Sequence, residues 1–308
     1  FKNLASYVPR QSLVVFNDTK VMPARLALRK ESGGKVEVLV LLNTFKKGDD
    51  EIEIISERKL ILGRRLFADA RTPFLITRQV ENIFYLRPEF DMENLHDVLL
   101  RFGVTPLPRY ITDHRFSEAE LRERYQSVFA RDPASVAAPT ASLHFTPSIL
   151  ASLKERGIPQ THLTLNVGLG TFSPPTPEQI RDTVLHSEPV KISKDASSAI
   201  FSAKRQRRTV VSVGTTVVRA LESCASEILS GQNGEVEKST NLFITPGFEF
   251  RITDALITNF HVPRSSLMSL VDAFLAHKKA SYTIFDLYRR AIKEKMRFYS
   301  FGDAMLIR

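Results

Sequence analysis

The stretch Thr209-Val210-Val211-Ser212-Val213-Gly214-Thr215-Thr216 decides the fold, because it leads from one kind of secondary structure directly into another. Its first five residues are mostly β-branched and predict a buried strand, and Gly214 allows a tight turn. Thr215 and Thr216 can begin the helix that the apolar pattern of residues 217–229 predicts. A strand that passes through a small-residue turn into a helix is typical of an α/β layer fold.

The alternation of strands and helices extends on both sides of this stretch. Thr146 as N-cap, Pro147 at the first helical position and Gly157 just past the end predict a helix. The run Ser-Leu-Val-Val-Phe from Ser12 predicts a buried strand. Further strands are expected at residues 161–167, 242–245 and 255–258, and further helices at 118–125, 266–276 and 282–297.

Residues 25–106 have a different character, because short β-rich runs recur there. The runs lie at residues 36–42, 52–55, 74–77 and 83–86, and a helix is expected at 93–102. Such spacing is typical of a small barrel or sandwich. We therefore expect a discontinuous α/β major domain of residues 1–24 and 107–308, with residues 25–106 as an inserted β domain.

Composition bounds the class of protein. The chain has 308 residues, 43% of them hydrophobic, so it can bury a large core. Its formal charge of +9 favours a polyanionic partner, although many basic proteins bind no nucleic acid. The single cysteine, Cys224, excludes an internal disulfide and suits a reducing cytosol. No apolar run reaches the roughly 20 residues that span a bilayer, so we expect a soluble, cytoplasmic protein.

Polar residues gather in several short segments between the expected elements. Ala138-Pro139-Thr140-Ala141-Ser142-Leu143-His144-Phe145 sets a histidine and two hydroxyls in a turn before a helix. Similar segments lie at residues 166–172, 186–188, 258–261 and 298–304. Loop residues of this kind usually face a ligand, so we expect distant loops to assemble one site.

These segments, together with Val15-Phe16-Asn17-Asp18-Thr19-Lys20-Val21-Met22-Pro23-Ala24-Arg25-Leu26, closely resemble the S-adenosylmethionine:tRNA ribosyltransferase-isomerase family of queuosine biosynthesis. The resemblance runs from Phe1 to Ile307. It implies a discontinuous α/β major domain with an inserted small all-β barrel. It also implies transfer and isomerisation of the ribosyl part of S-adenosylmethionine onto 7-aminomethyl-7-deazaguanine at the tRNA wobble position, giving epoxyqueuosine with release of adenine and methionine.

The implied partners are tRNA, through its anticodon region, and S-adenosylmethionine as co-substrate, without a further cofactor. No metal is expected, because the seven His residues show no ligand spacing and the chain has no cysteine pair. We expect a monomer.

The implied reaction needs groups that move protons. The sulfonium acidifies the C5′ hydrogens of the substrate, so a base could remove one, and adenine needs a proton donor or hydrogen bonds as it departs. His, Asp and Glu with pKa values near neutrality do this work. The sequence does not divide these roles, or separate them from structural hydrogen bonding, among the candidates His144, His186, Glu188, His261 and Asp303.

Small and polar residues in the same segments are candidates for substrate contacts. Glycines allow close approach of backbone N–H groups, and a helix start at Thr215 and Thr216 offers donors to an anion, although plain turns and N-capping explain these residues too. The full set is Asn17, Thr140, Ser142, Asn166, Gly168, Gly170, Thr171, Phe172, Thr215, Thr216 and Asn259.

Basic residues provide candidates for tRNA contacts. Lys204-Arg205-Gln206-Arg207-Arg208 is the densest cluster, and the expected last helix carries another, although such runs are often only solvated faces. Arg219 could instead pair with a neighbouring acid. The candidates are Arg25, Arg205, Arg207, Arg208, Arg219 and Arg297.

The chain departs from the family pattern at a few positions. Ser142 stands where the family usually has Gly, Asn166 where it has His, and Pro189 where an aromatic residue is common. An amide cannot act as a general base, so proton transfer at position 166 is lost. The alternatives are a divergent paralogue with another acceptor and a non-catalytic basic RNA-binding protein. We also expect a segment upstream of Phe1.

Overall fold

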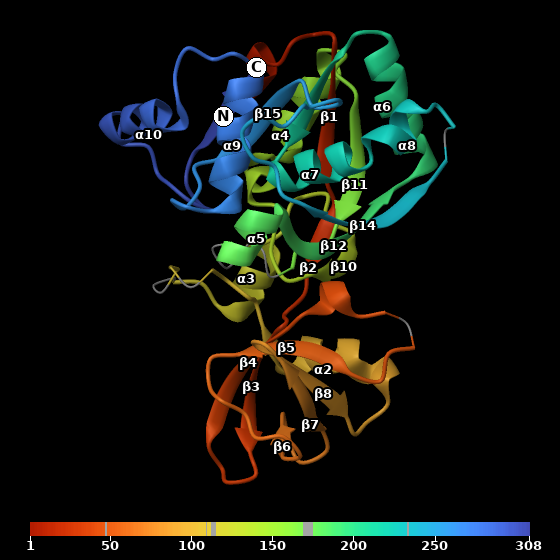
Figure 1. The fold of residues 1–308 in the computed structure, drawn as a ribbon, viewed down its shortest axis with the longest axis vertical. Coiled ribbons are helices and arrows are strands. Elements are labelled where there is room, and N and C mark those ends of the chain that lie inside the picture. The colour runs from red at the N-terminus through yellow and green to blue at the C-terminus, as the bar shows by residue number, and fades with distance from the viewer. Residues whose placement is uncertain (47, 109, 112–114, 169–174, 233) are drawn as a thin grey trace. The chain divides into compact units, whose positions relative to one another are not determined.

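The computed structural model describes residues 1–46, 48–108, 110–111, 115–168, 175–232 and 234–308 (Figure 1). The chain forms two compact units. Unit 1 comprises Phe1–Thr19, Ser127–Asp132 and Pro139–Arg308, and unit 2 comprises Lys20–Gln126 and Pro133–Ala138. The expected fold class, α/β with an inserted all-β barrel, is confirmed. The domain boundaries expected after residues 24 and 106 stay a prediction.

Unit 1 is built on a seven-stranded mixed sheet of order β14-β12-β11-β1-β13-β15-β16. Its four central strands are parallel: β11 (Gln160–Leu165), β1 (Ser12–Asn17), β13 (Thr209–Val213) and β15 (Ala255–Asn259). The outer strands run antiparallel to their inner neighbours: β14 (Val236–Leu242), β12 (Val184–Ile192) and β16 (Ala304–Ile307). All six residues of β1 are buried, as expected of a strand covered on both faces.

Helices cover both faces of this sheet. On one face Phe145, Ile149 and Leu153 pack against alternate strand residues such as Phe16 and Val211. On the other face α7 and α6 contact β13, β1 and β11. The helices of unit 1 are α1 (Leu4–Tyr7), η3 (Thr140–His144), α4 (Pro147–Glu155), α5 (Pro177–Asp182), α6 (Lys194–Arg205), α7 (Thr215–Ser223), α8 (Ala225–Leu229), α9 (Ser266–His277) and α10 (Ile284–Lys293).

Three sequence-based expectations differ from these elements. The helix expected at residues 217–229 is divided at Cys224, which ends α7 with φ −102° and ψ 12° and is fully buried. The strand expected at 242–245 lies earlier, as β14, and the last helix is shorter than residues 282–297. The sequence pattern does not predict β16, which is stabilised by pairing with β15 across more than 40 residues of chain.

Unit 2 contains a closed six-stranded barrel of order β4-β5-β8-β7-β6-β3, which β3 closes by pairing with β4. Apolar residues alternate along the strands, and Leu26, Leu28, Val36 and Val38 are buried. The strands are β3 (Arg25–Lys30), β4 (Lys35–Val40), β5 (Ile52–Ser56), β6 (Arg65–Phe67), β7 (Pro73–Val80) and β8 (Ile83–Pro88).

Short elements complete unit 2 and its links to the rest of the chain. They are β2 (Thr19–Val21), η1 (Leu42–Thr44), η2 (Met92–Asn94), α2 (Leu95–Phe102), β9 (Gly103–Val104), α3 (Glu118–Arg124) and β10 (Asp132–Ser135). Gly103 ends α2 where a Cβ would collide with the carbonyl oxygen of Pro23, so only glycine fits there. β9 then pairs with β3 at the margin of the barrel.

The topology of unit 1 predicts where a ligand binds. The next parallel strand after β1 along the chain is β11, on one side of it, whereas β13 is followed by β15 on the opposite side. The sheet order therefore switches direction between β1 and β13. In open α/β sheets, ligands bind outside the carboxyl ends of the strands at such a switch point.

Candidate functional site

The carboxyl edge of the parallel strands brings most of the predicted site residues together. We define the carboxyl edge as the strand exits at residues 17–19, 165–166, 214–216 and 258–261, with η3 at residues 140–144, which contacts β15. All of these residues belong to unit 1. Four of the five polar segments of the sequence contribute to it or contact it.

Asn17 ends β1 with a fully buried side chain that is hydrogen-bonded through both atoms of its amide. Its Oδ1 accepts from the backbone N–H groups of Leu165 at 3.0 Å and Thr19 at 3.2 Å. Its Nδ2 donates to the Leu165 carbonyl at 2.9 Å and lies 3.4 Å from the Thr216 hydroxyl. Asn17 therefore ties the exits of β1 and β11 to the beginning of α7.

Asp18 and Arg131 are further candidate site residues, and the sequence reasoning missed both. The Asp18 carboxylate, 1% exposed, accepts from Thr164 Oγ1 at 2.7 Å and Arg131 Nε at 2.6 Å. The Arg131 side chain is 71% exposed, so the rest of its guanidinium faces solvent beside the exit of β1. An acidic residue between Asn17 and Thr19 in a polar turn was the signal for Asp18, whereas nothing local marked Arg131.

Asn166 is held by its neighbours at the exit of β11. Thr19 Oγ1 donates to Asn166 Oδ1 at 2.6 Å, and the Asn166 backbone N–H donates to the Pro189 carbonyl at 3.1 Å. The amide is half-buried and can offer its remaining donors to a ligand.

Thr140, Asn259 and His144 form a chain of hydrogen bonds that links η3 to the end of β15. Thr140 Oγ1 donates to Asn259 Oδ1 at 3.1 Å. With the amide oxygen bound in this way, Asn259 Nδ2 faces His144 Nε2 at a distance of 3.2 Å. Because an amide NH₂ group can only donate, Nε2 is the unprotonated nitrogen and Nδ1 carries the proton. Asn259 thus sets the tautomer of His144.

The surroundings of His144 favour its neutral form. Desolvation by burial lowers the pKa of His144, and the carboxylate of Asp303 opposes this shift. Its ring stacks on Phe1 with centroids 4.9 Å apart. A neutral imidazole of fixed tautomer at the carboxyl edge is a suitable group for proton transfer.

His261 lies just past the end of β15 and is also neutral. Its Nε2 is 2.8 Å from Thr258 Oγ1, and its backbone N–H donates to the Tyr288 hydroxyl at 2.6 Å. Desolvation lowers the pKa of His261 to about 4, and desolvation raises the pKa of Tyr288 to about 12. Near pH 7 both groups are uncharged.

The start of α7 presents backbone donors to the carboxyl edge. Gly214 is the N-cap with φ 92°, a left-handed conformation that favours glycine, and it leaves the helix without a side-chain cap. Thr215 is buried and Thr216 half-buried. In η3, Ser142 is fully buried, and its Oγ has no hydrogen-bond partner in the part of the chain that the structure describes.

Glu188 lies in β12 beside the carboxyl edge and forms an ion pair with Arg219 of α7. Glu188 is 1% exposed and Arg219 6% exposed, and Glu188 Oε1 also accepts the Gly168 N–H at 2.8 Å. This is the pairing with an acid that the sequence left open for Arg219. His186, two residues earlier, is exposed, because the register of β12 shifts between Val184 and Glu188 and breaks the alternation.

Asp303 is half-exposed and hydrogen-bonded to Arg297. Its Oδ1 accepts from Arg297 Nη2 at 3.0 Å and its Oδ2 from the Arg297 N–H at 2.8 Å. Hydrogen bonds from Arg297 lower the pKa of Asp303, so it is a carboxylate at neutral pH. Gly170, Thr171 and Phe172 lie outside the described residues.

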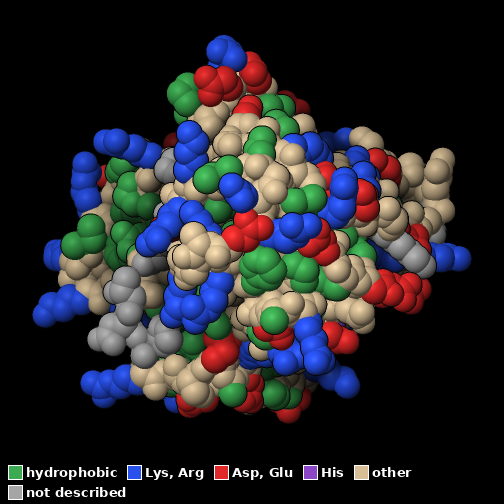
Figure 2. All heavy atoms as spheres, turned by 90° about the horizontal axis from the view of Figure 1, so that it is seen from below, with side chains coloured by type: hydrophobic (Ala, Val, Ile, Leu, Met, Phe, Trp, Pro, Cys, Tyr) green, Lys and Arg blue, Asp and Glu red, His purple; other side chains and the backbone are tan. Residues whose placement is uncertain are grey.

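The candidate RNA-binding arginines are divided between exposed and internal positions. Arg205, Arg207 and Arg297 are exposed. Arg208 Nη2 donates to the Ser12 carbonyl at 2.6 Å, and in unit 2 Arg25 pairs with Glu37 at 2.7 Å. On the face drawn in Figure 2, Lys and Arg side chains are spread widely, with acidic side chains between them.

The sequence model of one protein family, described as "Queuosine biosynthesis protein", matches residues 1–307. The chain belongs to this family of queuosine biosynthesis proteins. The expected resemblance is therefore confirmed, and the protein is an enzyme of this family.

Individual relatives carry a more specific name. Over 308 residues the chain is 41% identical to the S-adenosylmethionine:tRNA ribosyltransferase-isomerase of Carboxydothermus hydrogenoformans, covering 100% of this chain and 87% of that protein. The protein of the same name from Legionella pneumophila strain Lens is 40% identical over 309 residues, with the same coverage. The crystal structure of S-adenosylmethionine tRNA ribosyltransferase from Thermotoga maritima is similar with a TM-score of 0.50 and 28% identity, covering 100% of this chain and 86% of that one.

Two further observations concern the described part of the chain alone. None of its helices has the length and apolar character to cross a membrane. It also contains no group of three or more His, Cys, Asp or Glu side chains that could hold a metal ion. The expectation that the reaction needs neither metal nor further cofactor stays a prediction.

Proposed function

We propose that the protein transfers and isomerises the ribosyl moiety of S-adenosylmethionine onto 7-aminomethyl-7-deazaguanine at the tRNA wobble position. The products are epoxyqueuosine-tRNA, adenine and methionine. The full-length similarity to relatives named S-adenosylmethionine:tRNA ribosyltransferase-isomerase supports this activity. The convergence of polar side chains at the carboxyl edge supports the place where it occurs.

The observation that carries the proposal is the hydrogen-bonded chain from Thr140 through Asn259 to His144. It belongs to two segments that the family resemblance marked, and it joins them at the edge where α/β sheets bind ligands. We assign proton transfer at the substrate to His144, with His261 as the second neutral imidazole of the carboxyl edge. Asp303, held as a carboxylate by Arg297, contributes charge near His144.

The remaining residues of the carboxyl edge bind and orient the substrate. The backbone N–H groups of Thr215 and Thr216 in the first turn of α7 suit the carboxylate of the methionine part, since a helix N-terminus favours an anion. Asn166 offers amide donors beside it. Asn17 is internal and saturated, so its part is to hold these groups in register.

Product analysis tests the proposed function. S-adenosylmethionine labelled in its adenine and methionine parts is incubated with the protein and tRNA that carries 7-aminomethyl-7-deazaguanine. We expect adenine and methionine in equal amounts, and only in the presence of that base. Adenine release with tRNA that lacks the base would favour another acceptor, and no release with any tRNA would contradict the proposal.

Replacing His144 tests the assignment of proton transfer. His144→Gln should lower kcat by about 10²–10⁴-fold, the usual contribution of a positioned acid or base, while the protein stays folded. His96→Gln is the matched control, because that side chain is 53% exposed in α2 of unit 2. Equal rates for the two variants would remove His144 from the mechanism.

A further inference from the structure

The buried ion pair between Glu188 and Arg219 joins three elements of unit 1. Arg219 is the fifth residue of α7, the helix that begins at the switch point of the sheet. Its Nη1 donates to Glu188 Oε2 of β12, and its Nε donates to the Leu242 carbonyl at the end of β14 at 3.0 Å. The guanidinium thus holds β12 and β14 from inside the unit.

The other oxygen of Glu188 holds the segment that leaves β11. Glu188 Oε1 accepts the N–H of Gly168, which is buried and is the last residue of its segment that the structure describes. The next residue of β12, Pro189, accepts the N–H of Asn166 at 3.1 Å. Residues 166–168 are therefore fixed by β12, and Glu188 is the side chain that connects them to α7.

Stability alone is a poor reason for such a pair. Desolvating two charges costs several kcal/mol, and buried pairs can often be replaced by apolar residues without loss of stability. Here the cost is increased, because Arg219 Nη2 is buried without a hydrogen-bond partner in the described part of the chain. Because the pair carries this desolvation cost and lies beside the carboxyl edge, its effect on the geometry of that edge explains it better than stability does.

We propose that Glu188 and Arg219 are positioning residues that set the distance between the exit of β11 and the start of α7 for binding S-adenosylmethionine. The inference rests on the proposed function and deepens it. Both side chains and Gly168 are buried, so a tRNA cannot touch them directly. A small ligand held between residues 166–168 and 214–216, on either side of β1, depends on the spacing that the pair maintains.

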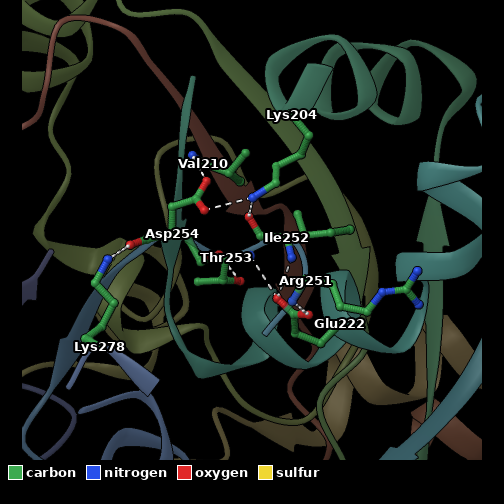
Figure 3. Close-up of polar contacts among 9 residues, drawn as sticks. Lys204, Val210, Glu222, Arg251, Ile252, Thr253, Asp254 and Lys278 are labelled. Atoms are coloured by element: carbon green, nitrogen blue, oxygen red, sulfur yellow. Dashed lines mark hydrogen bonds and ion pairs between the residues drawn. The ribbon is translucent and has the colours of Figure 1, made fainter. Parts of the chain in front are cut away.

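The same helix provides a matched control. Glu222, one turn after Arg219, is 8% exposed and accepts the N–H groups of Arg251 (2.8 Å), Ile252 (3.2 Å) and Thr253 (2.8 Å) (Figure 3). In Figure 3 these residues lie with Asp254 and Lys204 at the amino end of β15, opposite the carboxyl edge. Glu222 therefore resembles Glu188 in burial and hydrogen bonding but not in its place relative to the site.

Glutamine substitutions discriminate between the two carboxylates. In each carboxylate, the hydrogen-bond donors bind to different oxygens. Because the amide of glutamine has only one acceptor oxygen, Glu188→Gln must lose the hydrogen bond from either Arg219 or Gly168. Glu222→Gln loses part of its own contacts in the same way. We measure the Kd for S-adenosylmethionine by calorimetry, the KM for S-adenosylmethionine and for tRNA, and the melting temperature of wild type and both variants.

Both variants should melt at lower temperature, but only Glu188→Gln should bind S-adenosylmethionine more weakly, by roughly tenfold, with the KM for tRNA changed by less than about twofold. Equal Kd values in the two variants would overturn the inference. If Glu188→Gln does not fold, Arg219→Lys tests the inference instead. Lysine keeps the positive charge but lacks the several N–H donors of the guanidinium, so an unchanged Kd for S-adenosylmethionine would also contradict the inference.

The outcomes separate this inference from the proposed function. If wild type binds S-adenosylmethionine without releasing adenine, the proposed function fails and the Kd comparison still decides the positioning role. If wild type does not bind S-adenosylmethionine, the positioning role fails too.

Discussion

At the scale of single residues, the carboxyl edge contains polar groups that burial keeps neutral or leaves without a partner among the described residues. Two histidines are kept neutral by burial, and the hydroxyl of Ser142 is buried without a partner among the described residues. Each feature makes a measurable prediction.

Ser142→Ala should stabilise the protein. An unsatisfied buried hydroxyl carries a desolvation cost that alanine removes, so the free energy of unfolding should rise by about 1 kcal/mol. Urea denaturation of both proteins measures this difference. A fall in stability would mean that the hydroxyl has a partner within the protein, whereas a raised KM for S-adenosylmethionine would mean that the hydroxyl contacts the substrate.

His261 should make stability depend on pH between about 6.5 and 4. Its pKa is lower in the folded protein than the ordinary value of 6.5, so the unfolded chain takes up a proton first as pH falls. The stabilisation is complete above pH 6.5 and is lost progressively down to about 4, a change of about 3 kcal/mol at most. Denaturation of wild type and His261→Asn at several pH values measures it, and parallel curves would contradict it.

At the scale of elements, the side chain of Asn17 provides the hydrogen bonds that connect β1 to β11 where the two strands end. Its amide satisfies both backbone groups of Leu165 and one of Thr19, so its loss leaves buried polar groups unpaired. The neighbouring carboxylate of Asp18 continues the link toward Thr164 and Arg131. These hydrogen bonds hold the ends of β1 and β11 together.

Asn17→Ala should lower the free energy of unfolding by about 3 kcal/mol, because several buried hydrogen bonds are broken together. Asn241→Ala, on the exposed side of β14, is the control and should change stability by less than about 0.5 kcal/mol. Urea unfolding of the two variants provides the comparison. Similar values for both would show that Asn17 is not a structural link.

At the scale of the whole molecule, the formal net charge of +9 would attract the polyanionic tRNA. The exposed Arg205, Arg207 and Arg297 belong to unit 1, and further basic side chains are spread over the surface in Figure 2. Because phosphate contacts release counterions, binding through such residues weakens as salt rises.

The Kd for tRNA should rise by at least about tenfold between 50 and 200 mM salt, while the Kd for S-adenosylmethionine changes little. Arg205→Glu with Arg207→Glu should reduce the salt dependence, because both side chains are exposed. Filter binding at several salt concentrations measures the slope. A slope unchanged in the double variant would place the tRNA elsewhere on the surface.

The sequence predicts the parts of this molecule that are local and misses those that depend on distant contacts. Thr146, Pro147 and Gly157 predicted α4 because caps are encoded within a few residues. β16 and the bulge of β12 depend on partners far along the chain, so no local pattern marks them. For the same reason the sequence does not indicate Arg131, and it indicates Glu188 as a candidate without showing its partner.

The insertion of unit 2 after β1 has a consequence for how the protein is made. β1 pairs with β11 and β13, whose residues follow it by more than 140 positions, so during synthesis it leaves the ribosome long before either partner exists. The barrel, whose strands pair within residues 25–88, can close in the meantime. A newly made chain therefore carries a largely apolar, unpaired strand after the barrel has closed, and its vulnerability to aggregation ends only when residue 213 has emerged.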